Sequence, residues 1–148
     1  MPRRAGKFDT NVGVGFPVLV LPPALYTLET LLPVIGQTGV PPPPSAMPCA
    51  GLLDTGTNQT GITSSVIQGL GLSPAGGTRP FVGATGAGIA YVYVVDLLLS
   101  FEDGNMFVPN LEVLGVPWDL RLFKVLIGLD ILCLGTFSMS NGYFTFTI

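Results

Sequence analysis

The chain has 148 residues, of which 48% are hydrophobic and only 10% are charged, with a formal net charge of −3. This length fits one domain with a substantial core, and the 6 basic residues are too few to form a basic surface for nucleic acid. The chain contains no histidine, which excludes serine–histidine and cysteine–histidine nucleophiles and histidine metal ligands. Soluble monomers carry about 25% charged residues, so the low charge indicates either a membrane span or a large subunit interface.

The subunit interface is the better supported of these two interpretations. A membrane-spanning helix needs about 20 consecutive apolar residues, and the best candidate stretch, residues 12–35, is interrupted by prolines and by Glu29. Cys49 and Cys133 are too few for a disulfide framework or a thiolate metal site, and their apolar neighbours predict two buried free thiols. Free thiols favour a reducing compartment, so the cytoplasm is favoured over the periplasm. No residue pattern indicates a metal or an organic cofactor.

The 14 prolines and 20 glycines favour strands and turns over long helices. The first strand is expected at residues 12–21, and residues 27–47 are expected to form a proline-rich, exposed insertion in a single domain that spans residues 1–148. Further strands are expected at residues 49–53, 79–84, 89–101, 106–114, 125–128, 136–140 and 143–148. Short helices are expected at residues 63–71 and 130–134.

Two turn signals connect these strands. The glycine-rich segment 84–88 predicts a β-hairpin between its two flanking strands, and Asn141-Gly142 predicts a type I′ turn. Pro109 cannot donate a hydrogen bond to a neighbouring strand, so the strand that contains it is expected to be an edge or a bulged strand. The sequence therefore predicts an all-β chain.

The 9 acidic residues are the main candidates for chemistry. Asp54 and Asp130 differ from the others because each follows a hydrophobic run and lies near glycine, which lets backbones approach closely. An unpaired buried charge is costly, so a buried strand ends in a carboxylate only where the charge is paired, neutralised or used. The others are interpreted as solvated surface carboxylates: Asp9, Glu29, Asp96, Glu102, Asp103, Glu112 and Asp119.

A pair of motifs carries a family resemblance. Asp54-Thr55-Gly56 follows a buried strand, and Leu126-Ile127-Gly128-Leu129-Asp130 lies downstream. With the glycine-rich hairpin 81–88, this combination resembles the retropepsin-like aspartic proteases, the family of the dimeric retroviral proteases. The resemblance covers roughly residues 50–148, and the strings VGATG, YVYVVDL, LIGLDIL and GTFSMSNG look most like uncharacterised bacterial members. It implies a closed, barrel-like all-β fold with one or two short helices and a hairpin flap.

The resemblance also implies a homodimeric aspartic endopeptidase that acts on peptides or unfolded proteins. Aspartic proteases use two carboxylates that share one proton and a water, because like charges about 3 Å apart cannot both ionise. This chain has a single Asp-Thr-Gly, so the second carboxylate is expected from Asp54 of a second copy across a twofold axis. In retroviral enzymes the chain ends interleave into a dimer sheet, a role that residues 143–148 would take.

The resemblance assigns further roles residue by residue. Thr55 would hydrogen-bond across the pair of carboxylates, and Gly56 would let the substrate backbone come close. Asp130, supported by Gly128, would accept hydrogen bonds from the loop near Thr60. The residues expected to contact substrate are Thr57, Asn58, Gln59, Gly83, Ala84, Thr85, Gly86, Ala87 and Gly88.

The apolar composition predicts a preference for bulky apolar residues on both sides of the cut. The side chains expected to build these subsites are Ile62, Phe81, Val82, Ile89 and Leu122. Two alternatives stay open: a catalytically silent or latent peptide-binding or scaffolding module on the same fold, and an unrelated β-barrel in which Asp-Thr-Gly is only a turn. Casein cleavage at mildly acidic pH tests the first alternative. Gel filtration tests the second, which predicts a monomer.

Overall fold

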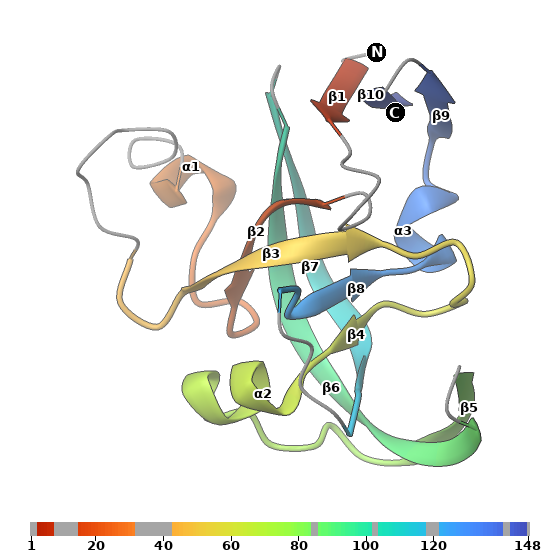
Figure 1. Ribbon diagram of the computed structural model, residues 1–148. Coiled ribbons are helices and arrows are strands. Elements are labelled where there is room, and N and C mark those ends of the chain that lie inside the picture. The colour runs from red at the N-terminus through yellow and green to blue at the C-terminus, as the bar shows by residue number, and fades with distance from the viewer. Residues whose placement is uncertain are drawn as a thin grey trace.

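The computed structural model describes residues 3–7, 15–31, 43–83, 86–101, 104–117, 122–140 and 143–147. Most of these residues lie in strands (Figure 1). The strands are β1 Arg3–Lys7, β2 Gly15–Leu21, β3 Met47–Leu53, β4 Gly61–Ile62, β5 Thr78–Gly83, β6 Gly86–Phe101, β7 Gly104–Gly115, β8 Val125–Ile127, β9 Thr136–Ser140 and β10 Tyr143–Thr147. The helices are α1 Leu28–Leu31, α2 Ser64–Leu70 and α3 Leu129–Leu132. The predicted all-β class is confirmed.

The central sheet closes into a barrel. Its strands follow the order β2-β3-β8-β4-β7-β6-β5, and β2 pairs back onto β6, so that β5 extends beyond the closed barrel. Within the wall, β3 and β8 run parallel with Leu53 beside Ile127, whereas β6 and β7 form a long antiparallel pair. Closure pairs strand edges that would otherwise be open to other chains. The barrel confirms the closed fold that the resemblance implied.

Over residues 92–99, both faces of β6 are buried or half-buried, which explains the continuous hydrophobic run there. Val95, Leu97 and Leu99 belong to the barrel core, whereas Leu98 belongs to a second apolar cluster on the other side of the strand. Each of these four side chains is at most 1% exposed. Full burial of one such side chain contributes roughly 1.5–3 kcal/mol to folding, so β6 is a main source of the stability of the barrel.

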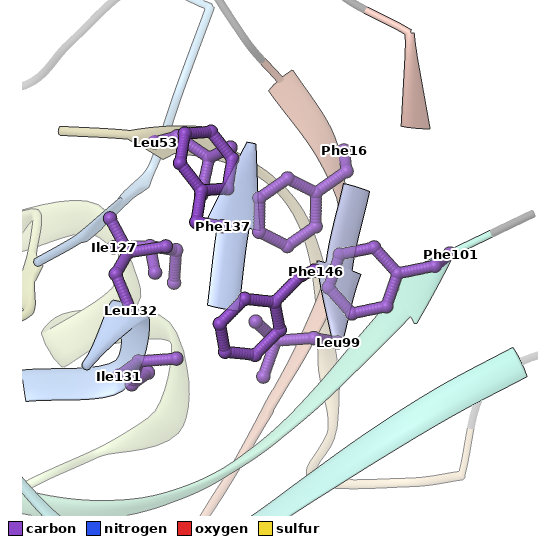
Figure 2. A pocket seen from close by; sticks show the side chains of 9 residues that line it. All are labelled: Phe16, Leu53, Leu99, Phe101, Ile127, Ile131, Leu132, Phe137 and Phe146. Atoms are coloured by element: carbon purple, nitrogen blue, oxygen red, sulfur yellow. The ribbon is translucent and has the colours of Figure 1, made fainter. Parts of the chain in front are cut away.

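A small sheet of order β1-β10-β9 lies near both chain ends (Figure 1). Phe146 of β10 and Phe137 of β9 reach the barrel core beside Phe16 and Phe101 (Figure 2), whose rings stack with centroids 5.1 Å apart. A small cavity of about 10 Å³ lies between the two parts. Its lining is entirely apolar: Phe16, Leu53, Leu99, Phe101, Ile127, Ile131, Leu132, Phe137 and Phe146. An apolar void this small stays dry, so close packing holds the small sheet on the barrel.

The C-terminal strand β10 pairs on both sides within its own chain. Phe146, for example, lies opposite Arg4 of β1 and Phe137 of β9. The expectation that this strand interleaves with partner strands is therefore wrong, because neither of its edges is open to them. The outer edges of the small sheet belong to β1 and β9.

The predicted hairpin is present, with a shorter tip than expected. β5 and β6 pair from Thr78 and Tyr91 to Gly83 and Gly86, so β6 begins before Ile89, where the sequence analysis started it. The two tip residues, Ala84 and Thr85, lie outside the described residues. A β-carbon at Gly88 would lie 2.9 Å from the Phe81 ring, so glycine is needed for this close cross-strand packing.

The proline-rich insertion is not simply an exposed loop. It contains α1, and Leu31 of that helix is fully buried against Leu21 and Leu98. The hydroxyl of Tyr26, directly before the insertion, also donates a hydrogen bond to the carbonyl of Pro44 near its other end. Residues 32–42 lie outside the described residues. The expectation of full exposure failed because apolar residues of the insertion cover the outer face of β2 and β6.

Asp96 was expected to be a solvated surface carboxylate, which is wrong: the residue is only 2% exposed. Its carboxylate accepts hydrogen bonds from the N–H groups of Ala24 at 3.0 Å and Asn110 at 2.7 Å. Both donors have positive φ, 60° for Ala24 and 50° for Asn110, a left-handed conformation that costs about 1 kcal/mol or more for alanine but that asparagine tolerates. Asp96 therefore binds two left-handed backbone positions, of which that of Ala24 is unfavourable.

Asn110 belongs to a β-bulge on β7, where Leu111 and Val108 lie opposite Val95 and Leu97 of β6. The extra residue on β7 is accommodated beside Pro109, as the sequence predicted for a bulged strand. β7 is nevertheless an interior strand, between β4 and β6.

The two cysteines differ in burial. Cys49 is half-buried on β3, and burial raises the pKa of its thiol to about 11, although nearby Lys124 acts in the opposite direction. Cys133 is exposed after α3, so the prediction that both thiols are buried is wrong for this residue.

Candidate active site

Two loops meet at one end of the barrel to form the candidate site. Because β3 and β8 are parallel neighbours, their carboxyl ends lie side by side (Figure 1). Asp54 directly follows β3, and Gly128 directly follows β8. The N–H of Asp54 donates to the carbonyl of Ile127 at 2.9 Å, which extends the strand pairing as far as the carboxylate. The barrel wall therefore holds the backbone of Asp54.

The backbone turns sharply after Asp54. The carboxylate Oδ1 accepts a hydrogen bond from the N–H of Gly56 at 2.9 Å, and the carbonyl of Asp54 accepts one from the N–H of Thr57 at 3.4 Å. A β-carbon at Gly56 would lie 3.1 Å from Oδ1, so glycine keeps the space beside the carboxylate open. Asp54 is half-buried, and Thr55 and Gly56 are exposed. The turn is therefore accessible to a substrate or to another chain.

Asp130 fixes this loop through hydrogen bonds with Thr60. Its Oδ1 accepts a hydrogen bond from the Thr60 hydroxyl at 2.7 Å, and its Oδ2 accepts one from the Thr60 N–H at 3.0 Å. The Thr60 hydroxyl oxygen in turn accepts a hydrogen bond from the N–H of Gly128 at 3.1 Å. Thr60 is fully buried. The hydrogen bonds expected between Asp130 and the loop near Thr60 are thus present.

Gly128 lies where the two loops come closest. A β-carbon at this position would be 2.8 Å from the carbonyl carbon of Gln59 and 3.0 Å from the carbonyl oxygen of Thr57. The adjoining backbone of Leu129 and Asp130 donates hydrogen bonds to the carbonyls of Thr57 and Asn58, at 2.9 and 3.1 Å. Only glycine allows this approach, because both contacts are with rigid backbone.

Gln59 makes contacts that the sequence did not indicate. Its Oε1 accepts a hydrogen bond from Nη1 of Arg79 at 2.9 Å, and its Nε2 donates to the carbonyl of Glu112 at 3.2 Å. Arg79 Nη2 also forms an ion pair with Glu112 Oε2 at 2.5 Å. Both ends of the Gln59 amide therefore bind protein groups. Arg79 and Glu112 were missed, because nothing in their local sequence places them beside Gln59.

The remaining predicted substrate contacts fall into two groups. In the loop, the Thr57 hydroxyl donates to the carbonyl of Gln59 at 3.0 Å, and Asn58 is exposed. In the hairpin, Gly83 pairs with Gly86. Further along β6, Ala87 is exposed and Gly88 is half-buried. The hydrogen bond from Arg79 to Gln59 connects the hairpin with the loop.

The residues predicted to build the apolar subsites differ in their exposure. Ile62 is fully buried in the barrel core, so it cannot line a cleft in this chain. Phe81 packs against a small cluster of Ala90, Val92 and Leu114. Ile89 and Leu122 are 73% and 59% exposed, which leaves them accessible. The side chain of Val82 lies outside the described residues.

The other acidic residues of the described ranges have different locations. Asp130 bonds to Thr60, Asp96 binds backbone at the β7 bulge, and Glu112 pairs with Arg79. Glu29 lies on α1 in the insertion.

The insertion joins β3 at Met47, and the 7 residues of β3 separate that end from Asp54, a span of about 20 Å. The anchored part of the insertion is therefore remote from the candidate site.

Within the part of the chain that the structure describes, no group of three or more cysteine, aspartate and glutamate side chains is arranged to hold a metal ion. Among the same residues, no helix has the length and apolar character that crossing a membrane requires.

Comparison with known proteins shows the fold. No protein-family model and no curated protein sequence matches the chain. A solved structure does match: a retropepsin-like aspartic protease from Rickettsia conorii, with a TM-score of 0.59 and 12% sequence identity. The match covers 98% of this chain and 90% of that chain. The chain therefore has the retropepsin-like fold that its sequence motifs implied.

Proposed function

We propose that the protein is a homodimeric aspartic endopeptidase in which two Asp54 carboxylates, one per subunit, activate a water to hydrolyse peptide bonds. The observation that most supports this proposal is the Asp54 turn. A half-buried carboxylate stands at the carboxyl end of a barrel strand and accepts a hydrogen bond from the N–H of Gly56. The fold around it is shared with an aspartic protease.

The chemistry needs two carboxylates that share one proton. The ionised carboxylate takes a proton from the water, whose oxygen then attacks the carbonyl carbon of the peptide. The protonated carboxylate donates to the carbonyl oxygen as negative charge develops there. When the tetrahedral intermediate collapses, the carbon–nitrogen bond breaks and the leaving nitrogen takes the proton that the first carboxylate removed from the water. A hydroxyl proton of the intermediate returns to the other carboxylate as the product acid forms, so the pair again shares one proton. The two pKa values of such a pair belong to the pair and not to either residue.

The second carboxylate comes from a second copy of the chain. Of the other acidic residues in the described ranges, Asp96, Glu112 and Asp130 make other contacts and Glu29 lies on α1 in the insertion, and the chain has a single Asp-Thr-Gly. The exposed Thr55 and Gly56 suit a symmetric contact in which the two turns meet. The low charge content supports a large interface. The outer edges of the small sheet, β1 and β9, are available to extend that interface.

The β5–β6 hairpin acts as the flap in this proposal. Its base is hydrogen-bonded to the active-site loop through Arg79 and Gln59. Closure over a bound peptide would exclude water and offer backbone groups to the peptide main chain. The accessible apolar residues Ile89 and Leu122 support a preference for apolar side chains around the cut.

The test is cleavage of unfolded casein at mildly acidic pH by the wild type and by Asp54→Asn, after the mass of each has been measured in dilute solution. We expect the wild type and Asp54→Asn both to be dimers, and only the wild type to cleave casein. If Asp54→Asn cuts at the wild-type rate, Asp54 is not catalytic and the proposal fails. If neither dimer cuts, the protein is a peptide-binding or latent module on the same fold.

A further inference from the structure

We propose that three residues, Gln59, Arg79 and Glu112, form a latch that positions the base of the hairpin against the active-site loop. Its effect on cleavage rests on the proposed function, whereas its effect on hairpin opening does not.

The latch joins three elements that are distant in sequence. Gln59 lies in the loop after β3, Arg79 on β5 and Glu112 on β7. Arg79 donates to the Gln59 side chain at 2.9 Å and to the Glu112 carboxylate at 2.5 Å, and Gln59 donates to the Glu112 carbonyl at 3.2 Å. The three contacts form a closed ring. A guanidinium suits this position because its rigid fork can bind two acceptors at once.

The latch lies on the hairpin face that contacts the barrel. Alternate strand residues share a face, so Arg79 points to the same side as Phe81. Phe81 packs on Ala90, Val92 and Leu114. The opposite face carries Ile89, which is 73% exposed, and Tyr91, which is 58% exposed. The hairpin is therefore held at its base by one polar and one apolar contact.

The exposure of the ion pair makes it reversible. The side chains of Arg79 and Glu112 are 46% and 55% exposed, so water and salt screen their attraction. Exposed ion pairs of this kind change an equilibrium by up to about fivefold. A contact of that strength biases the hairpin toward the closed position and still allows it to open for substrate.

The latch also acts on the loop that carries Asp54. The carbonyl of Gln59 accepts the Thr57 hydroxyl, and its carbonyl carbon is in tight contact with Gly128. A shift of Gln59 would therefore displace the part of the loop backbone that lies near the Asp54 carboxylate. Because both ends of its amide are engaged, we assign Gln59 as a positioning residue in place of the substrate contact that the sequence analysis expected.

Hydrogen exchange of the hairpin amides tests the latch without any assay of activity. We expect Arg79→Met and Glu112→Gln each to speed exchange of the β5 amides by about three- to fivefold. Lys124→Met is the matched control for Arg79→Met, because it removes the same charge beside the far end of β8. Glu29→Gln is the control for Glu112→Gln, because it neutralises an exposed carboxylate in the insertion. Neither control should change β5 exchange.

Charge reversal separates the ion pair from a general loss of stability. Glu112→Arg should speed exchange, and the double variant Arg79→Glu with Glu112→Arg should return it to within about twofold of the wild type, since the attraction is restored. The proposal is overturned if Glu112→Gln leaves β5 exchange unchanged or if the reversed pair rescues nothing. If the Arg79 variants do not fold, the Glu112 variants decide the question alone.

Kinetics connect the latch with catalysis. With an apolar peptide substrate, Glu112→Gln should raise KM by about threefold and leave kcat within about twofold, because the latch does not touch the reacting atoms. High salt should raise the KM of the wild type but not that of the variant. Gln59 keeps its hydrogen bond to the Glu112 carbonyl in this variant, so a fall in kcat with KM unchanged would overturn the role of the ion pair in holding the hairpin. If the wild type cuts no peptide, the proposed function fails while the exchange result still decides the latch.

Discussion

Asp54 and Asp96 are both carboxylates set in hydrophobic strand sequence, yet they occupy opposite kinds of environment. Asp96 is 2% exposed and accepts hydrogen bonds from two backbone N–H groups at left-handed positions. Asp54 is half-buried, bonds one N–H within its own turn and lies beside exposed residues. A carboxylate buried among backbone donors organises the fold, whereas one held rigidly at an open turn is available for chemistry. The flanking glycine, and not the hydrophobic run, distinguishes the two in the sequence.

The largest expected effect is the loss of cleavage in Asp54→Asn. Positioned acid–base groups contribute about 10²- to 10⁴-fold to the rate, so we expect kcat to fall by at least about 10²-fold. The urea midpoint should stay close to that of the wild type, because the amide can still accept the Gly56 N–H. Parallel measurements of peptide cleavage and urea unfolding check both statements. A large drop in stability would mean that Asp54 is structural, as Asp96 is.

Asp96→Asn should reverse this pattern. The amide has one acceptor oxygen, so one of the N–H groups of Ala24 and Asn110 loses its partner. A buried donor without a partner costs about 1–3 kcal/mol. We expect urea unfolding to show a loss in that range, with kcat kept at a temperature where the variant is folded. Unchanged stability would contradict the structural role of Asp96.

Gly128→Ala tests the close contact between the two active-site loops. The added β-carbon would lie 2.8 Å from the carbonyl carbon of Gln59, so the loops must separate. Overpacking of this kind costs about 1–3 kcal/mol, and we expect cleavage to fall with the displaced turn. Gly69→Ala is the control, since its close neighbour is the flexible end of Met47 and it lies on α2. Equal effects of the two changes would show that the loop contact has no special role.

The smallest expected effect concerns the thiols. At pH 8 the thiolate fraction at Cys49 is low, because burial raises its pKa from 9.0 to about 11. Compared with a thiol of pKa 9.0, Cys49 has a roughly hundredfold smaller thiolate fraction. Its thiolate is more nucleophilic, which partly offsets this difference, so alkylation of Cys49 slows by roughly tenfold. Cys133, which is exposed, should therefore react first with iodoacetamide, as peptide mass spectrometry would show. Faster labelling of Cys49 would contradict its burial.

The sequence predicted the parts of the site that depend on local pattern. Asp54-Thr55-Gly56 and Gly128-Leu129-Asp130 each need specific residues at adjacent positions, so they can be recognised from a single chain. The contact of Gln59 with Arg79 spans 20 residues, and its contact with Glu112 spans 53. Such contacts depend on strand register, which no local pattern determines.

The burial of Asp96 was missed for a related reason. It depends on the bulge opposite Asp96 and on the loop after β2, which bring two N–H groups to one carboxylate. The pairing of β10 was missed because the comparison with retroviral enzymes assigned it partner strands, whereas β1 and β9 of the same chain occupy both its sides.

The most direct test of the central claim is the activity of mixed subunits. Wild-type and Asp54→Asn chains are unfolded together in equal amounts, refolded and assayed at the same total concentration as the wild type alone. If each active site takes one Asp54 from each of two chains, only wild-type pairs cut, and activity falls to about one quarter. If each chain carries a complete site, activity falls to about one half, and that result would contradict the shared site.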